Sequence, residues 1–540
     1  MIDVKTLDEA LDLSWCLRRL RPKSPYGLEY KKALKPYPRG TEEFLRRRLD
    51  SLERLVTWCK ETDRLKDLLH LLSEAKELRT TISRAKDGAI LSEVELFEVK
   101  ALVGLFDKIS RLAEESNLPM EDDMALVGLE ELWRLFNPKK SREDSFYIYD
   151  TYSLRIAQVR GQRADAENRM RRGIRDLKKR LREDFDIRLG ADNTLLCPKA
   201  DEEMKNRLEA CGALRFQSET YSHLIFSLRL PEEIQELTEE VERLKEAEEA
   251  EERRIRGEIS KEVGKYKKEL FHNIHALGRL DLDIAKARMA LEMEAVKPEI
   301  CDDVGIFIDE GRHPKIEAAL KEKDLSFTPI SLSLTSGVTC ITGANMGGKT
   351  ISLKLTGLLA LMAQMGLFVP AKSMGLGLLS HIKTSIGDMQ STDSGLSTFG
   401  GEIRMVADAM KVADEPGLIL IDELARGTNP REGYAISRAI VDDLRHRASI
   451  TLLTTHFDRI TEEEGVRHLQ VTGLGHVNFD EFDVSSFEDR LSLLNRMMDY
   501  RLVEVSKDTK VPKDAIAIAR IMGLSPEVLS RAEETNLKGW

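Results

Sequence analysis

The chain has 540 residues, too many for one hydrophobic core, so its length excludes a single small domain and predicts three or four. Charged residues make up 33% of the chain and aromatic residues only 6%, which favours long charged helices over a β-rich fold. The formal net charge of −11 excludes a protein that coats nucleic acid over its whole surface, but it permits a local basic patch.

The cysteines and the N-terminal segment indicate the cellular compartment. None of the six cysteines forms a C-x-x-C pair, so neither a zinc site nor a disulfide framework is indicated, and reduced cysteines are typical of the cytoplasm. The acidic N-terminus lacks the apolar core of a signal peptide, and the most apolar segment, Leu355–Val369, is too short to span a bilayer. We therefore expect a cytoplasmic protein with no membrane partner.

Residues 1–145 are predicted to form a helical core or lever domain. Leu49, Leu52 and Leu55 recur at helical spacing, and breaks rich in proline and glycine separate the helices. A helical scaffold is the simplest interpretation of this region.

Residues 146–270 are predicted to form long helical arms that carry a small α+β tip. Short apolar runs at 194–196 and 224–228 indicate strands, with turns at glycine and asparagine. Pro231 then opens a second long helix, because proline is well placed in a first turn.

This second helix changes character along its length. Ile234, Leu237, Val241 and Leu244 follow a coiled-coil register. The segment 246–256 is nearly all charged, which predicts an arm exposed to solvent.

The first arm is strongly basic over 155–182. A basic helix face can bind the phosphates of a polyanion such as DNA, or it can be an ordinary solvated surface, and the sequence leaves both interpretations open. The cations are Arg155, Arg160, Arg163, Arg169, Arg171, Arg172, Arg175, Lys178, Lys179, Arg180 and Arg182, against Asp165, Glu167 and Asp176.

Residues 271–300 are predicted to form a connecting helix that ends before Pro298. From about residue 301, glycines become frequent and strand-like runs alternate with helices, the pattern of an α/β sheet domain. A domain boundary is therefore expected near residue 300, with 301–540 as the α/β domain.

The segment ITGANMGGKT at 341–350 fits the phosphate-binding loop pattern G-x-x-x-x-G-K-T, between a predicted strand at 338–342 and a predicted helix at 351–366. Glycines let backbone N–H groups converge on a polyphosphate, and the helix adds the positive end of its dipole. The lysine can reach the terminal phosphates, and the threonine hydroxyl can bind Mg²⁺. The predicted nucleotide contacts are Gly343, Ala344, Asn345, Met346, Gly347, Gly348, Lys349, Thr350 and Ile351.

Two further motifs supply candidate catalytic groups. The apolar run 418–421 predicts a buried strand, and the carboxylates of Asp422 and Glu423 follow at its end. We expect Asp422 to hold Mg²⁺ through water and Glu423 to act as the general base for the attacking water. Another predicted strand begins at Ile450 and ends at His456, for which a role as γ-phosphate sensor is expected.

The turn at 395–402 contains Ser397 and opens a helix, which makes it a second candidate phosphate site. The first site already has its own loop. The spare turn therefore suggests a dimer in which each subunit completes the nucleotide pocket of the other. An ordinary helix N-cap at Ser397 or Thr398 is the alternative interpretation.

These motifs resemble those of the MutS family, in the ABC class of ATPases. The likeness rests on GRHP at 311–314, TGANMGGKT at 342–350, LSTF at 396–399, LILIDELARGT at 418–428 and TTHF at 454–457. Three longer segments also resemble family elements: the core lever helix, a closing pair of dimerisation helices, and the start of the MutS branch that carries an endonuclease-type tail. These are 277–300, 515–532 and 24–55, respectively.

The resemblance implies a fold and a set of roles. It predicts a mostly α-helical lever and clamp region at 1–300, with the clamp at 155–230, followed by an ABC-type P-loop ATPase domain at 301–540. ATP and Mg²⁺ are the implied cofactors. The implied roles are phosphate and Mg²⁺ binding by Lys349 and Thr350, adenine stacking by Phe327, γ-phosphate contact across the dimer by Ser397, Mg²⁺ binding and hydrolysis by Asp422 and Glu423, and switching by His456.

The resemblance leaves the partner open. Gly400–Glu402 and Ala425–Pro430 differ from the usual mismatch-repair forms, and we expect a short member of the family without the mismatch-recognition domain or the nuclease tail. The favoured hypothesis is a dimeric ATPase, of two copies or of one copy with a related subunit, that clamps and remodels non-mismatched DNA such as branched DNA.

Two alternatives differ in class. The segment 429–433, NPREG, resembles MutS-like ATPases that act as reactivases of cobalamin (B12)-dependent amino-acid aminomutases, so the partner could instead be such an enzyme. A nucleotide sensor without turnover is a third interpretation, and the presence of Glu423 and His456 argues against it.

Overall fold

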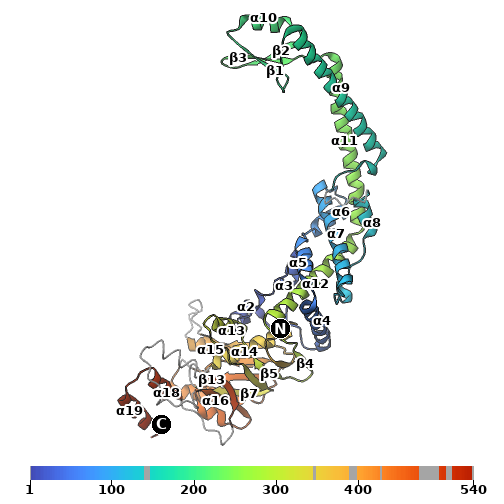
Figure 1. Ribbon diagram of the computed structural model, residues 1–540. Helices are drawn as coiled ribbons and strands as arrows, with labels where there is room; N and C mark the ends of the chain where they lie inside the picture. The colour runs from blue at the N-terminus through green and yellow to red at the C-terminus, as the bar shows by residue number, and fades with distance from the viewer. Residues whose placement is uncertain are drawn as a thin grey trace. The chain divides into compact units, whose positions relative to one another are not determined.

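The computed structural model of the chain divides into two compact units (Figure 1). Unit 1 contains Met1–Glu74, Ile109–Ala125 and Ile274–Trp540, and unit 2 contains Ala75–Lys108 and Leu126–Asn273, so the chain leaves unit 1 twice and returns each time. The predicted four-part division at 145, 270 and 300 stays a prediction. The structure describes residues 2–138, 146–343, 348–387, 398–425, 428–473, 498–505 and 514–537.

Unit 2 is built from long helices and one small sheet. The sheet is antiparallel with the strand order β1-β3-β2. The sequence predicted β1 and β3 but missed β2, in which the alternation of apolar and polar residues covers only 214–217 and every side chain after Leu214 is exposed. The elements of this unit are α6 (Arg79–Lys86), α8 (Glu130–Phe136), η2 (Asp150–Tyr152), α9 (Leu154–Phe185), β1 (Thr194–Pro198), α10 (Glu202–Ala210), β2 (Leu214–Glu219), β3 (His223–Leu228) and α11 (Glu232–Lys265).

Helices α9 and α11 pack along one another within unit 2. Ile234 and Val241, two of the predicted coiled-coil positions, are buried. A Cβ atom at Gly173 of α9 would come within 3.0 Å of Ile234, so the absence of a side chain lets the two helices approach closely at this point.

The charged segment 246–256 of α11 is only partly exposed, in contrast to the prediction. Glu248 and Glu251 are buried because cationic side chains neutralise them. Arg160 Nε lies 2.8 Å from Glu248 Oε1, and Arg163 Nη1 lies 2.6 Å from Glu248 Oε2. The basic α9 and the acidic α11 are therefore electrostatic partners, a relation that neither segment reveals when it is considered alone.

Unit 1 begins with short helices. Ser24 caps α3 by accepting the Gly27 N–H at 2.9 Å, and its hydroxyl donates to Asp281 Oδ2 at 2.6 Å. A Cβ at Gly27 would lie 2.2 Å from that carboxylate, so only glycine fits there. The helices are α1 (Val4–Leu11), α2 (Leu13–Leu17), α3 (Pro25–Lys32), α4 (Glu42–Glu61), α5 (Leu65–Glu74) and η1 (Asp122–Met124), while α7 (Glu93–Glu115) and α12 (Lys267–Glu292) continue from unit 2.

Two sheets form the α/β part of unit 1. The larger has the order β13-β12-β7-β11-β10-β9 and is parallel except for the pair β12–β13; the smaller has the order β4-β8-β5-β6. The combination of a helical region with mixed α/β sheets agrees with the predicted fold class. The strands are β4 (Glu299–Cys301), β5 (Ile306–Gly311), β6 (Ile330–Leu334), β7 (Gly337–Thr342), β8 (Ser373–Gly377), β9 (Ile382–Ser385), β10 (Leu418–Ile421), β11 (Ile450–Thr454), β12 (Val466–Gly473) and β13 (Asp499–Glu504).

Helix α14 is the centre of the larger apolar core of unit 1 and is buried along nearly its whole length. Residues of α1 and α2, including Leu11, join the same core. A Cβ at Gly357 of α14 would lie 2.7 Å from both Leu11 and Leu420, so the glycine lets an N-terminal helix and a strand reach α14 together. The other helices are α13 (Pro314–Lys321), α14 (Lys349–Gln364), α15 (Thr398–Met410), α16 (Pro430–Leu444), η3 (Asp458–Glu462), α18 (Asp514–Ile521) and α19 (Pro526–Leu537).

Arg312, in the GRHP segment, ties the end of α12 to this core. Its Nη2 donates to the carbonyl oxygens of Met293 at 2.9 Å and Glu294 at 3.0 Å. A cation at a helix C-terminus satisfies carbonyl groups that have no partner within the helix. In the part of the chain that the structure describes, no helix is long and apolar enough to cross a membrane.

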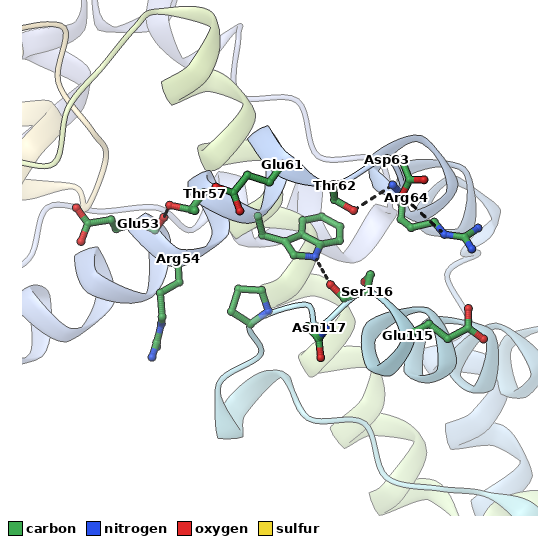
Figure 2. Close-up of a pocket in the computed structure, with 12 residues that line it drawn as sticks. Glu53, Arg54, Thr57, Glu61, Thr62, Asp63, Arg64, Glu115, Ser116 and Asn117 are labelled. Carbon is green, nitrogen blue, oxygen red and sulfur yellow. Dashed lines mark hydrogen bonds and ion pairs between the residues drawn. The ribbon is translucent and has the colours of Figure 1, made fainter.

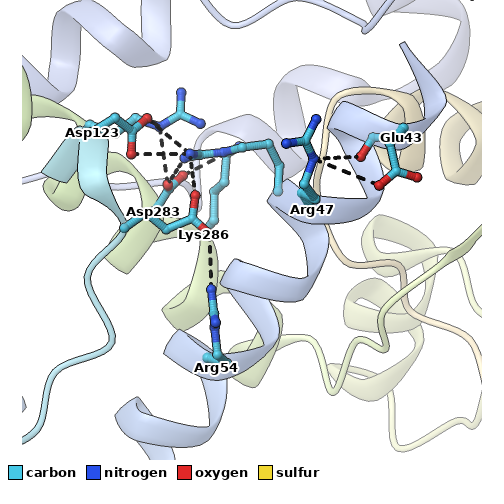
Figure 3. Close-up of polar contacts among 9 residues, drawn as sticks. Glu43, Arg47, Arg54, Asp123, Asp283 and Lys286 are labelled. Carbon is cyan, nitrogen blue, oxygen red and sulfur yellow. Dashed lines mark hydrogen bonds and ion pairs between the residues drawn. The ribbon is translucent and has the colours of Figure 1, made fainter. Parts of the chain in front are cut away.

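A buried cluster of charges joins α4, η1 and α12 within unit 1 (Figure 3). Asp283 Oδ2 accepts from Arg48 Nη2 at 2.6 Å, and Arg279 Nε lies 3.3 Å from the same oxygen. Lys286 Nζ lies 3.7 Å from the other carboxylate oxygen, Oδ1. Arg48 also contacts Asp123 at 3.1 Å. Three cations therefore share one buried carboxylate, and Arg48 and Arg279 also reach the more exposed Asp123.

Candidate nucleotide-binding and hydrolysis site

The predicted phosphate-binding loop connects a central strand to the first turn of a buried helix. Strand β7 ends directly before Gly343, at the predicted residue, and α14 begins directly after Gly348, two residues before the predicted start at Ile351. Both glycines have positive φ, +133° and +80°, a backbone conformation that favours glycine. The predicted contacts at 344–347 (Ala, Asn, Met, Gly) lie outside the described residues. The described flanks fit the strand–loop–helix context that the motif requires.

Lys349 is a buried cation in the first turn of α14. Its Nζ donates to the carbonyl oxygen of Gly343 at 2.8 Å, across the mouth of the loop. Burial lowers the pKa of the Lys349 ammonium, and the nearby carboxylates of Glu423 and Asp422 oppose that shift. A partly desolvated ammonium in this position is suited to binding phosphate oxygens.

Asp422 lies at the carboxyl end of β10, next to the start of α14. The Thr350 hydroxyl donates to Asp422 Oδ2 and the Thr454 hydroxyl donates to Asp422 Oδ1, each at 2.8 Å. Because β7, β11 and β10 are parallel neighbours, their carboxyl ends meet at one edge of the sheet, which is where ligands bind in open α/β sheets. The two hydroxyls fix the carboxylate at that edge.

Glu423 and His456 are paired. Glu423 Oε1 lies 2.9 Å from His456 Nε2, and the Glu423 N–H donates to the Thr454 hydroxyl at 2.8 Å. The Glu423 side chain is 15% exposed and that of His456 46% exposed, so the pair faces solvent from its histidine side. Glu423 has a left-handed backbone, with φ of +52°, which is uncommon for a residue other than glycine and occurs frequently at functional sites.

A cavity of about 470 Å³ opens beside the loop. Phe327 lines it, as does Ile351 of α14, together with Gly348, Met498 and Tyr500. Most of its lining side chains are aromatic or aliphatic, with Asp324, Ser326 and Thr328 as polar members, and this mixture suits a flat nucleobase. The predicted stacking residue Phe327 therefore lies in a chamber adjacent to the predicted phosphate loop.

The described residues fit a nucleotide with Mg²⁺. Thr350 and Asp422 offer hydroxyl and carboxylate oxygens within 2.8 Å of one another, the ligand type that Mg²⁺ prefers. Lys349 supplies a buried positive charge, and the cavity with Phe327 supplies an apolar chamber. Ser397, predicted to act across a dimer, lies outside the described residues.

Two residues of this site were not predicted. The Thr454 hydroxyl donates to the Asp422 carboxylate and accepts the Glu423 backbone N–H. The argument that found His456, the carboxyl end of a parallel strand, could have identified Thr454 as well. Tyr500 of β13 lines the cavity, and a Cβ at Gly348 would approach its ring to 3.1 Å. Burial raises the pKa of the Tyr500 phenol. No motif precedes Tyr500, so the sequence held no signal for it.

A second cavity, of about 790 Å³, lies elsewhere in unit 1, at the C-terminal ends of α4 and α7 (Figure 2). Trp58 Nε1 donates to the carbonyl oxygen of Ser116 at 2.9 Å along its wall. Its lining mixes the acids Glu53, Glu61 and others with arginines, and it includes none of the predicted site residues. The candidate site is therefore the one at the phosphate loop.

Comparison with known proteins agrees with this geometry. Residues 339–538 match the family model described as MutS domain V, a range that includes the loop, both carboxylates and the histidine. Three curated relatives carry the name Endonuclease MutS2. The protein from Geobacillus thermodenitrificans is 29% identical over 514 residues, covering 89% of this chain and 60% of the relative. That from Halalkalibacterium halodurans is 28% identical over 503 residues, covering 88% and 59%.

The third relative, from Lachnospira eligens, is 31% identical over 477 residues, covering 86% of this chain and 56% of the relative. The chain thus spans less than two thirds of the length of these relatives. The match nevertheless extends far beyond the ATPase motifs into the helical part of the chain. With the phosphate loop, the paired carboxylates and the histidine converging in one place, the chain belongs to the MutS family.

Proposed function

We propose that the chain binds and hydrolyses ATP. The observation that carries this proposal is the convergence of Lys349, Thr350, Asp422, Glu423 and His456 at one sheet edge. Glu423 is the group that would take a proton from the attacking water, and His456 holds its carboxylate. Phe327 and Tyr500 would enclose the base. Thr350 and Asp422 would hold Mg²⁺, which when bound neutralises charge on the phosphates.

Replacing Lys349 with alanine tests the ATP site. We expect ATP affinity to fall at least about tenfold, because a hydrogen bond to a charged group is worth about 1.5–3 kcal/mol. Lys354 is the matched control: it lies on the same helix and pairs with Asp12 at 3.5 Å instead of facing the loop. Titration with a fluorescent ATP analogue should show normal affinity for Lys354→Ala. If both variants bound ATP with the affinity of the wild type, Lys349 would not be part of the ATP site.

We further propose that the functional form is a dimer in which Ser397 of one subunit completes the ATP site of the other. The support is the MutS family relationship and the presence of a second phosphate-binding turn in the sequence. Leu524, in the connection between α18 and α19, is 47% exposed and Val528 of α19 is 49% exposed, a pattern suited to contact with a second copy or a related subunit.

DNA is the partner that we propose for unit 2. In the described part of this unit, the proximal arginines of α9 form ion pairs with α11: Arg160 and Arg163 contact Glu248, and Arg155 contacts Glu251. Arg160 and Arg163 lie within 2.8 Å of the buried Glu248, so these two charges serve α11 and not a polyanion, whereas Arg155 is 70% exposed and lies 3.9 Å from Glu251. The sequence left open one continuous binding face over 155–182. Because of this pairing, we propose that only the half of α9 nearer its C-terminal end binds DNA.

The distal half of α9 carries a basic stripe, which we define as Arg172, Arg175, Lys179 and Arg182. All four are exposed, and their spacing places them on one face of the helix over about 15 Å. Gly173 packs against Ile234 on a different face, so the stripe points away from α11. Of the four, only Lys179 has an ion pair among the described residues, with Glu183 at a long 3.9 Å. A row of cations of this length suits the phosphates of a DNA backbone, and the relatives named above are endonucleases.

Salt dependence separates the two halves of α9. Arg175→Ala should reduce the slope of log affinity for duplex or branched DNA against log salt by about 0.9, the amount expected for one lost phosphate contact. Arg163→Ala is the control, because Arg163 already pairs with Glu248 at 2.6 Å, and Glu248 keeps its contact with Arg160 at 2.8 Å when Arg163 is removed. Fluorescence anisotropy at several salt concentrations measures both slopes. Equal slopes for the two variants, or DNA binding that does not respond to salt, would contradict the stripe.

The other interpretations gain no support. The relatives named above carry the name Endonuclease MutS2 and do not favour a reactivase of a B12-dependent aminomutase. The sensor interpretation without turnover is disfavoured by the Glu423–His456 pair, which is poised for proton transfer. DNA remodelling driven by ATP is therefore the function that we propose.

A further inference from the structure

The loop that follows β10 has a strained backbone. Glu423 and Ala425 both have left-handed conformations, with φ of +52° and +63°. Each costs about 1–2 kcal/mol for a residue with a side chain, so surrounding contacts must hold the loop in this form. The position of the Glu423 carboxylate depends on this loop, because Glu423 is its first residue after Asp422.

Three contacts outside the loop hold it. The Thr454 hydroxyl accepts the Glu423 N–H at 2.8 Å, and the Ser437 hydroxyl donates to the Leu424 carbonyl oxygen at 3.3 Å. The third contact is the shortest: Glu402 Oε1 accepts the Ala425 N–H at 2.7 Å. Glu402 comes from α15, the helix that begins at Thr398, directly after Ser397 in the chain.

The Glu402 contact is hard to replace. Ala425 is buried, at 3% exposure, so the Glu402 carboxylate and not bulk solvent satisfies its N–H in this structure. An unsatisfied buried N–H costs about 1–3 kcal/mol, a cost comparable to the strain of the left-handed alanine itself. Both penalties would act together to drive Ala425 out of its present conformation. Burial also raises the pKa of Glu402, although the Ala425 N–H opposes that change.

We infer that Glu402 is a positioning residue for ATP hydrolysis: it keeps the Glu423–Ala425 turn in the form that holds the Glu423 carboxylate against His456. Glu402 lies on α15, whereas the proposed nucleotide-binding residues Lys349 and Thr350 lie on α14. Its loss should therefore affect the chemical step and leave ATP binding intact. This inference rests on the proposed ATPase function.

The hydrogen bond, and not the negative charge, is the feature that matters. Glutamine keeps an acceptor oxygen at the same reach and lacks the charge, whereas aspartate keeps the charge and is shorter by one methylene. We expect Glu402→Gln to hydrolyse ATP at close to the wild-type rate. Glu402→Ala and Glu402→Asp should each lose at least about tenfold in kcat, since small displacements of a catalytic group have large effects on rate.

The test measures kcat, KM and ATP affinity for the wild type and the three variants. A fall in kcat for alanine and aspartate, normal ATP affinity in all four proteins and recovery with glutamine would establish the positioning role. Normal ATP affinity also shows that each variant is folded at the site. Three results would each overturn the positioning role. They are wild-type kcat in the aspartate variant but not in the glutamine variant, a loss of ATP affinity in Glu402→Ala as large as its loss of kcat, and unchanged kcat in all three variants. Absence of turnover in the wild type would overturn the proposed ATPase function as well, which distinguishes the two failures.

Discussion

Glu423→Gln is expected to bind ATP with wild-type affinity and to hydrolyse it at least about a hundredfold more slowly, the range typical of a lost general base. Glutamine can keep the contact with His456 that Glu423 Oε1 makes at 2.9 Å, but it cannot accept a proton. Binding should persist because Lys349 and Thr350 lie on a different element, α14. Single-turnover hydrolysis, measured beside ATP affinity, separates the two effects.

The control for this variant is Glu432→Gln. Glu432 is an exposed residue in the first turn of α16, a few residues further along the chain. Its substitution by glutamine makes the same chemical change away from the site. Its turnover should equal that of the wild type. Wild-type turnover in Glu423→Gln would show that another group accepts the proton, and equal slowing in both variants would show that the effect is not specific to the pair with His456.

Asp283→Asn should destabilise the protein by about 3–5 kcal/mol, the usual cost of breaking a buried ion pair from one side. Asp283 faces Arg48, Arg279 and Lys286, and its side chain is 6% exposed (Figure 3). Without the carboxylate, the buried Lys286 would face the positive charges of Arg48 and Arg279, whose remaining ion pairs are with Asp123 and, for Arg48, also with Glu121. Urea unfolding followed by intrinsic fluorescence measures the change in the free energy of unfolding.

The control for Asp283→Asn is Asp302→Asn. Asp302 also pairs with an arginine of α4, Arg46, but it is 85% exposed, so water replaces the lost partner. We expect a far smaller change in unfolding free energy. Similar losses of unfolding free energy in both variants would contradict the claim that the Asp283 ion pairs stabilise the protein strongly because they are buried.

The same cluster predicts a pH dependence. Burial lowers the pKa of Lys286 from an ordinary value of 10.5 to about 8, so the folded state releases this proton before the unfolded state does. Stability therefore rises with pH between about 8 and 10.5, by about 3 kcal/mol in all. Lys286→Met cannot titrate and should lack this rise. A wild-type stability that does not increase relative to Lys286→Met across that interval would refute the assignment.

The elements that contain the motifs could be predicted from the sequence because their signals are local. Strand β7, helix α14 and strand β10 follow from apolar runs and from the loop pattern itself. Contacts between distant segments could not be predicted in this way. The packing of Leu11 against Gly357 and the burial of Glu248 by Arg160 depend on two segments that have no shared pattern.

In the candidate site, too, some residues could be predicted from local signals and others could not. Lys349, Asp422 and His456 follow recognisable strands, so their convergence could be anticipated from the geometry of a parallel sheet. Tyr500 enters from the antiparallel edge strand β13, and Glu402 acts through a hydrogen bond to a backbone N–H. Neither role could be recognised from residue type or spacing, because tyrosine and glutamate are common on the strands and helices of any protein.

The most direct test of the account mixes two inactive variants. Lys349→Ala disables the phosphate loop of its own subunit and Ser397→Ala disables the contribution to the partner, so each variant alone should have little ATP turnover. If each site is shared between subunits, a mixed dimer contains one intact site, and an equal mixture after subunit exchange should recover about a quarter of wild-type turnover. A mixture as inactive as its components, with exchange confirmed by labelled subunits, would contradict the shared site.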